Sequence, residues 1–378
     1  MEIKLPNYFK ITVILLGLVL LIYLLQLFKS VLAPLAFSIL FALLLLPLTR
    51  HLERLRVPRP LAILCSITLV VVVLAMVIWF LSSQMMDLTS ELDSISGNVG
   101  DLIANVQDFL YHKFGIKPSN RTELIQNMIG SLQDIATSFL GNTISMTTGV
   151  IAALTVVPIF VFCLLYYRDH LEEFLFKFVT RDRRSGLLQT ITNIQQVVQS
   201  YISGLMIVIV VVSLLNSAGL LILGVNYALF FGIFASVLTI IPYIGIMIGA
   251  TVPALFTLAA TGHLIDAVLV IAVFAFVQFL EGNFITPLVV GSKVSINPFA
   301  AIVALLIGGE IWGAPGMIIA LPFIAMLKVI FDRYPPLAPI GFLLADIDDV
   351  HPKRKGKVQS WFAEIWNGLT HGKREEDL

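Results

Sequence analysis

The sequence predicts an all-α, polytopic membrane protein with about eight transmembrane helices, and three observations lead to that fold class. The chain of 378 residues is 58% hydrophobic and only 13% charged, whereas soluble domains carry about 25% charged residues. Its mean hydropathy is +0.94. The apolar residues come in repeated runs near the ~20 residues that a helix needs to cross hydrocarbon, rather than in the alternating segments of about ten residues found in a β-barrel.

Residues 1–81 are expected to hold the first three transmembrane helices. The apolar runs 11–28 and 31–48 are separated by only two residues, which predicts a tight hairpin. The loop RHLERLRVPRP comes next, and short loops rich in Lys and Arg stay in the cytoplasm. The N-terminus is then also expected in the cytoplasm, and the third run, residues 61–81, leads to the opposite side.

Residues 82–145 are predicted to form an extracytoplasmic amphipathic helical insertion. The segment is polar and carries few basic residues, which favours the outside of the cell. Its apolar residues recur at steps of three and four, as in a helix that buries one face. Two interpretations of this seam stay open, an intramolecular helical hairpin and an oligomer contact. The first part of the seam consists of Leu88, Leu92, Ile95, Val99, Leu102, Val106 and Phe109.

Residues 146–204 are predicted to contain transmembrane helix 4 and a cytoplasmic helix, because several arginines and a lysine follow the apolar run. The cytoplasmic helix leads into residues 205–333, which we expect to form a transport core with broken helices. Within this core the apolar run 228–260 contains Pro242 followed by Gly245. Proline removes a helical hydrogen bond, so the run predicts two half-helices.

The run EGNFITPLVVGSKVSINPFAAIVALLIGGEIWGAPGMIIALP, residues 281–322, is apolar enough for a bilayer but rich in helix breakers. Such breakers are tolerated at membrane depth only where the freed backbone groups are buried in protein or line a wet cavity. Asn297 and Pro298 are expected to restart a helix, and GGEIWGAPG, residues 308–316, to break it. Whether residues 284–310 re-enter or cross the membrane stays open.

Residues 334–378 are predicted to be a cytoplasmic tail. A basic run, KRKGK, is followed by apolar residues of 358–369 that fall on one helical face. This pattern is typical of an interfacial helix on the inner leaflet.

Glu281 and Glu310 flank the broken stretch and are the leading functional candidates. A carboxylate in or near hydrocarbon is costly, which points to a functional role such as carrying a proton or binding Na⁺. The other interpretation places each glutamate at the interface, in headgroup water. Neutral amides nearby suit a polyol, and prolines free backbone groups for a solute or ion. The candidate substrate- or ion-binding residues are Gln278, Glu281, Asn283, Glu310, Asn297, Pro242, Gly245, Pro287 and Pro298.

Signatures of enzymes and of nucleic-acid binding are missing from the sequence. It contains no GxxxxGK[ST], HExxH or GxSxG motif. The six histidines lack metal-ligand spacing, so neither a metal nor a cofactor is predicted. The formal net charge is +0, which gives no reason to expect nucleic acid as a partner. The sequence therefore predicts a protein that is not an enzyme.

Three stretches of the chain resemble the autoinducer-2 exporter family, a bacterial group also described as PerM-like permeases. They are IPYIGIMIGATVP, QFLEGNFITPLVVG and NPFAAIVALLIGGEIWGAPGMIIALP. The order of apolar runs, the insertion after the third run and the string YISGL agree, so the resemblance covers nearly the whole chain. It implies a homo-oligomeric secondary transporter whose translocation elements are Pro242–Gly249 and Glu281–Gly316. Some members export the autoinducer-2 signal, and others resemble Na⁺(Li⁺)/H⁺ antiporters.

We therefore expect a multi-pass protein of the bacterial inner membrane, with both termini in the cytoplasm. It would export a small polar solute, such as the autoinducer-2 quorum-sensing signal, with H⁺ or Na⁺ as coupling ion. The expected partners are this solute, the ion, the lipid bilayer and further copies of the chain. Two alternatives stay open: Na⁺(Li⁺)/H⁺ antiport without an organic substrate, and a non-transporting oligomeric membrane scaffold organised by the insertion.

Overall fold

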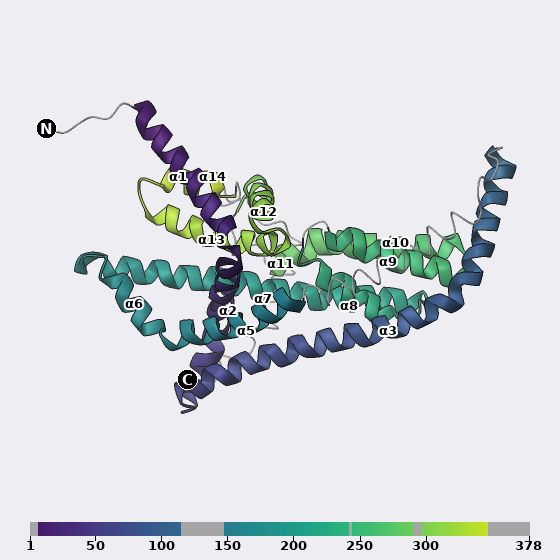
Figure 1. Cartoon of the computed structure of the whole chain (residues 1–378), viewed down its shortest axis with the longest axis horizontal. Coiled ribbons are helices and arrows are strands. Elements are labelled where there is room, and N and C mark those ends of the chain that lie inside the picture. Colours follow the sequence, from purple (N-terminus) through teal and green to yellow (C-terminus); the bar gives the residue numbers. More distant parts are fainter. Residues whose placement is uncertain (1–6, 115–146, 242–243, 290–295, 347–378) are drawn as a thin grey trace, which may run out of the picture. The chain divides into compact units, whose positions relative to one another are not determined.

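The computed structural model describes residues 7–114, 147–241, 244–289 and 296–346, and all of their regular structure is helical (Figure 1). Within these residues, five helices are long and apolar enough to cross a membrane by length and composition, and five shorter apolar helices accompany them. The predicted all-α, polytopic class is therefore confirmed.

The first of two compact units comprises Met1–Ile67, Ala153–Ser200 and Val294–Pro352. Its helices come from the two ends and the middle of the chain. They are α1 (Asn7–Leu27), α2 (Lys29–Arg54), the start of α3 (Arg59–Phe114), most of α5 (Thr147–Tyr166), α6 (Arg168–Phe176), the 3₁₀ turn η1 (Arg181–Arg183), the first part of α7 (Arg184–Ile222), α12 (Pro298–Trp312), α13 (Ala314–Arg333) and α14 (Ala338–Leu344).

The predicted tight hairpin between the first two apolar runs is wrong. Helical hydrogen bonds continue through the junction, where Phe28 N donates to Leu24 O (3.0 Å) and Leu32 N donates to Phe28 O (2.9 Å). The chain therefore bends between α1 and α2 instead of reversing (Figure 1). The two polar residues of the junction are neither glycine nor proline, so they do not interrupt the helical backbone. This bend removes the argument that placed the N-terminus in the cytoplasm.

A one-residue turn at Gly313 joins α12 to α13. Its φ is +67°, a backbone conformation that glycine adopts without strain. The two helices then approach so closely that a Cβ on Gly316 would lie 2.7 Å from the carbonyl carbon of Gly308. The break is therefore confined to Gly313, and it is narrower than the predicted break over residues 308–316. The predicted helix start at Asn297 and Pro298 is confirmed.

The second unit comprises Thr68–Ala152, Tyr201–Lys293 and Lys353–Leu378. Its described helices follow one another closely along the chain. They are the rest of α3 and α7, then α8 (Ala228–Leu238), α9 (Ile244–Thr261), α10 (Leu264–Leu280), the π-helical turn η2 (Glu281–Ile285) and α11 (Thr286–Val289).

The predicted break in the apolar run 228–260 is confirmed, since α8 and α9 are separate helices. Pro242 itself lies outside the described residues. The two helices pack closely, because a Cβ on Gly249 would lie only 2.8 Å from the Cβ of Ala235. A small residue at such a contact lets two helix backbones approach. The core around this contact includes Met85, Leu88, Leu220, Phe230, Phe231, Phe256, Val270 and Phe274.

Two of the predicted domain boundaries fall inside continuous helices. Helix α3 continues past residue 81, so the third apolar run and the first part of the insertion are one helix. Helix α7 likewise continues past residue 204. An apolar helix and an amphipathic helix have the same backbone geometry. A change along the chain from apolar to mixed residues therefore does not end the helix. The later part of the insertion, residues 115–146, and the predicted interfacial helix of residues 358–369 lie outside the described residues.

Candidate functional site

Glu281 lies where the candidate membrane span Leu264–Val289 changes its helical winding. Helix α10 ends one residue earlier, and Glu281–Ile285 form a π-helical turn in which Thr286 N donates to the Glu281 carbonyl. Single π-helical turns inside α-helices occur frequently at functional sites. The site therefore combines an acidic residue with an irregular helix inside an apolar span.

The local sequence explains this π-helical turn. Pro287 has no N–H to donate to the carbonyl of Asn283, and its ring would clash with that carbonyl in a regular α-helix. Gly282 adds backbone freedom at the same place, because it has no Cβ. The backbone hydrogen bond here spans five residues instead of four, and the helix then continues as α11.

Both carboxylate oxygens of Glu281 accept a hydrogen bond. Gln278 Nε2 donates to Oε2 over 2.6 Å, and Thr286 Oγ1 donates to Oε1. All three side chains are half-buried. Hydrogen bonds to an ionised acceptor are stronger than those between neutral groups. The carboxylate is thus held from both sides, and it connects α10 to α11.

Sequence reasoning identified Gln278 and Glu281 but missed Thr286. In an α-helix a residue five positions further along lies about 140° away around the axis. The π-helical turn reduces that angle, so the Thr286 hydroxyl reaches the Glu281 carboxylate. The proline at position 287 was the available signal, because it predicts a disturbed turn just before it.

The same side of this span packs against α7. Val277 and Ile285, one turn before and one turn after Glu281, belong to an apolar cluster with Val208 and Val212 of α7. Residues four apart lie on one side of a helix. Glu281 therefore belongs to the side that carries these packed residues, rather than to a fully exposed side.

The other candidates of this unit have different surroundings. The exposed Asn283 side chain donates to the Phe279 carbonyl over 2.9 Å. Pro287 is exposed. Gly245 packs against the backbone at Leu238, where a Cβ would have no room.

Asn297 in the first unit joins the start of α12 to the end of α14. Its Oδ1 accepts from Ala300 N (2.7 Å), and its Nδ2 donates to the carbonyls of Leu343 (2.6 Å) and Ala345 (3.2 Å). Pro298 occupies the first helical position, where its missing N–H costs nothing. Asn297 therefore acts as an N-cap in this structure.

Glu310 is exposed near the end of α12. Its carbonyl accepts from Gln26 Nε2 over 3.3 Å, and Trp312 Nε1 donates to Leu25 O over 2.8 Å. These bonds attach the end of α12 to the end of α1, and they leave the Glu310 carboxylate out of the described hydrogen bonds and ion pairs.

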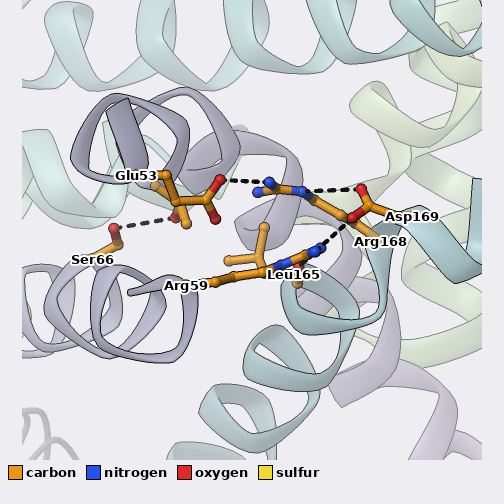
Figure 2. Close-up of polar contacts among 7 residues, drawn as sticks. Glu53, Arg59, Ser66, Leu165, Arg168 and Asp169 are labelled. Atoms are coloured by element: carbon orange, nitrogen blue, oxygen red, sulfur yellow. Dashed lines mark hydrogen bonds and ion pairs between the residues drawn. The ribbon is translucent and has the colours of Figure 1, made fainter. Parts of the chain in front are cut away.

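A second polar cluster, which sequence reasoning did not predict, joins two loops of the first unit (Figure 2). Arg168 Nη2 lies 2.6 Å from Glu53 Oε2, and Arg59 Nη1 lies 2.5 Å from Asp169 Oδ2. The hydrogen bond from Arg59 holds the pKa of the Asp169 carboxyl below its usual value of 3.8. The two loops that the arginine pattern predicted to be cytoplasmic therefore lie side by side.

The sequence matches a family of known proteins over most of its length. The sequence model described as "AI-2E family transporter" matches residues 11–336, which is most of the chain. The chain belongs to the AI-2E transporter family. It is 28% identical over 313 residues to the "Putative transport protein YrrI" of Bacillus subtilis, covering 81% of this chain and 87% of the relative. It is 23% identical over 345 residues to the "AI-2 transport protein TqsA" of Escherichia coli, covering 90% and 97%.

Membership of the AI-2E family agrees with the predicted resemblance. Together with the apolar helices, it shows that the chain is a multi-pass membrane protein of a transporter family. The predicted class of activity, membrane transport, is confirmed at this level.

Proposed function

We propose that the protein is a secondary transporter of a bacterial inner membrane that exports a small polar solute of the AI-2 type, coupled to H⁺ or Na⁺ at Glu281. The observation that supports this proposal is the carboxylate of Glu281, which lies well inside a candidate membrane span of high mean hydropathy and accepts two side-chain hydrogen bonds. The name of the Escherichia coli relative supports the solute class.

The hydrogen bonds suggest how the ion would act. An ionised carboxylate is an acceptor only, so it holds Gln278 and Thr286 at the same time. A bound proton or Na⁺ would neutralise the carboxylate and occupy part of its acceptor capacity, which would weaken the hydrogen bonds from Gln278 and Thr286. Loss of the bond from Thr286 would remove the side-chain link between Glu281 and the start of α11. Ion binding would then favour a second arrangement of the broken span, which is the differential interaction that a coupled transporter requires.

A second candidate function is Na⁺(Li⁺)/H⁺ antiport without an organic solute. The same observation favours it, because a single carboxylate that alternates between H⁺ and Na⁺ is sufficient for exchange. The two candidates differ in whether an organic solute moves with the ions.

The test is a flux measurement in proteoliposomes with an imposed pH gradient. Wild type is compared with Glu281→Gln, which keeps the shape and removes the charge. Asp266→Asn is the matched control, since Asp266 is an acidic residue in the first turn of the same helix and lies 3.9 Å from His263. We expect Glu281→Gln to reduce ion-dependent flux at least tenfold, which corresponds to an increase of about 1.4 kcal/mol or more in the activation barrier, and Asp266→Asn to leave the flux unchanged.

The outcomes separate the candidates. Saturable movement of a labelled AI-2-like diol that depends on Glu281 supports the coupled exporter. Proton release on adding Na⁺, without diol movement, supports the antiporter. Equal ion-dependent flux by wild type and Glu281→Gln would show that Glu281 is not the coupling group.

A further inference from the structure

Helix α6 has an exposed apolar stripe. Leu171, Phe174, Leu175 and Phe178 follow one another at positions i, i+3, i+4 and i+7, so they share one side of the helix and its immediate end. Phe174 and Phe178 are 53% and 74% exposed. Among the nine residues of α6, all of them described, none is buried. This stripe therefore needs something outside the described unit to cover it.

Basic residues follow the stripe directly. Lys177 comes just after α6, and Arg181, Arg183 and Arg184 lie in η1 and at the start of α7. The guanidinium of Arg184 lies 5.5 Å from the centre of the Phe176 ring, which ties the two ends of this turn together.

Acidic residues are also present, but most of them lie away from the stripe. Asp169 and Glu173 lie on the opposite side of α6, Glu172 lies at its flank, and Asp182 sits within the basic turn. Two of the acidic side chains of α6 thus point away from the apolar stripe, and the basic turn adjoins the C-terminal end of that stripe. That combination is typical of a helix that lies in a membrane interface.

The start of α6 is fixed in position. Arg59 donates to Asp169 and to the carbonyl of Leu165 (3.0 Å), and Arg168 pairs with Glu53, so residues on either side of the α2–α3 loop hold the turn between α5 and α6 (Figure 2). The direction in which α6 leaves α5 is therefore set by a charged cluster rather than by burial of α6 itself.

The turn also lies at a membrane boundary by composition. The apolar helix α5 ends with Tyr166, and Tyr166 and Tyr167 are exposed, with ring centres 5.0 Å apart. Tyrosine is enriched at the level of lipid headgroups. Helix α6 thus starts where a membrane-crossing helix would leave the hydrocarbon.

We propose that α6 and the basic turn after it dock onto anionic phospholipid headgroups of the leaflet at which α5 ends. Phe174 and Phe178 would enter the headgroup layer, and Lys177 and Arg181 would face the lipid phosphates. Opposite charge selects anionic over zwitterionic lipid, and each basic residue near such a surface contributes about a fivefold preference. This surface is independent of the transport proposal, because it involves neither Glu281 nor a transported ion.

The test uses the full-length protein in nanodiscs. Cys65 and Cys163 are replaced by alanine, and an environment-sensitive fluorophore is attached to Phe178→Cys or, as the matched control, to Glu173→Cys on the opposite side of α6. Emission is followed as phosphatidylglycerol replaces phosphatidylcholine. We expect a blue shift at position 178 that grows with the anionic fraction, and no comparable shift at position 173.

Charge is tested with Lys177→Gln and Arg181→Gln in the Phe178→Cys background. Each variant should move the midpoint of the blue shift to about fivefold more phosphatidylglycerol, and 0.5 M salt should act in the same direction. A shift that is the same at positions 173 and 178 would overturn the proposal. A blue shift at position 178 that is unaffected by lipid charge would also overturn it. The same holds for a blue shift that requires a second copy of the chain and not the anionic lipid.

Discussion

Replacing Gly232 by alanine should destabilise the second unit strongly, because α7 and α8 touch through their backbones at this position. A Cβ on Gly232 would lie 2.6 Å from the backbone N of Ser217 and 2.8 Å from its Cα, in addition to a close approach to its Oγ. The hydroxyl could rotate away, but the backbone atoms cannot. Moving the Ser217 N from 2.6 Å to the 3.4 Å of an ordinary contact requires α7 to shift by about 0.8 Å.

Such a shift disturbs several other contacts. Ser217 and Ser236 are at most 5% exposed, and Asn216 Nδ2 donates to Ser236 Oγ over 3.4 Å. Overpacking in a well-packed core costs about 1–3 kcal/mol. We expect Gly232→Ala to lower the free energy of unfolding by an amount at the upper end of this range or above it, because the hydrogen bond between Asn216 and Ser236 would be lengthened as well.

The measurement is the apparent melting temperature of the purified protein in detergent. Gly282→Ala is the control, since nothing lies within 4 Å of a Cβ added there. We expect a clear decrease of the melting temperature for Gly232→Ala, whereas Gly282→Ala should leave it unchanged or raise it, by up to about 1 kcal/mol of stability, because alanine is the better helix former. Equal melting temperatures of wild type and Gly232→Ala would refute the backbone contact between α7 and α8.

Three further predictions concern the first unit. Arg168→Ala should lower the free energy of unfolding by about 1–3 kcal/mol, measured by thermal unfolding, because it leaves Glu53 without its partner in a mostly buried position. The pKa of Asp169 is lowered by Arg59, so the ion pair should contribute fully at neutral pH and be lost as the pH falls below 3.8; the stabilities of wild type and Asp169→Asn should therefore converge in acid. Asn297→Ala should cost about 1 kcal/mol, and Asn297→Ser should recover most of the capping part, because serine is also an N-cap but cannot reach Leu343 O. For Arg168→Ala and Asn297→Ala, a melting temperature equal to that of wild type would contradict the contact on which the prediction rests, and for Asp169→Asn so would a difference from wild type that does not change with pH.

Local patterns in the sequence were enough to predict the helices and several of their ends. Apolar runs of membrane-crossing length predicted the fold class, Pro242 and Gly245 predicted the break between α8 and α9, and Asn297 and Pro298 predicted the start of α12. These features depend on residues close together in the chain, so a single sequence contains them. The acidic residue Glu281 was also visible, because a carboxylate inside an apolar run is rare.

Only the tertiary structure decided which distant groups meet. The Glu53 and Arg168 side chains lie 115 positions apart in the sequence, and neither hydropathy nor helical period relates them. The hydroxyl of Thr286 reaches Glu281 only because one helical turn is π-helical. The structure also shows a bend between α1 and α2 where the sequence predicted a hairpin. Two polar residues that are neither glycine nor proline can continue a helix or end it, and the packing of the surrounding helices decides which occurs. The sequence by itself therefore determined the helices and pointed to Glu281. The partners of the side chains, and the places where the chain reverses, followed from packing between distant segments.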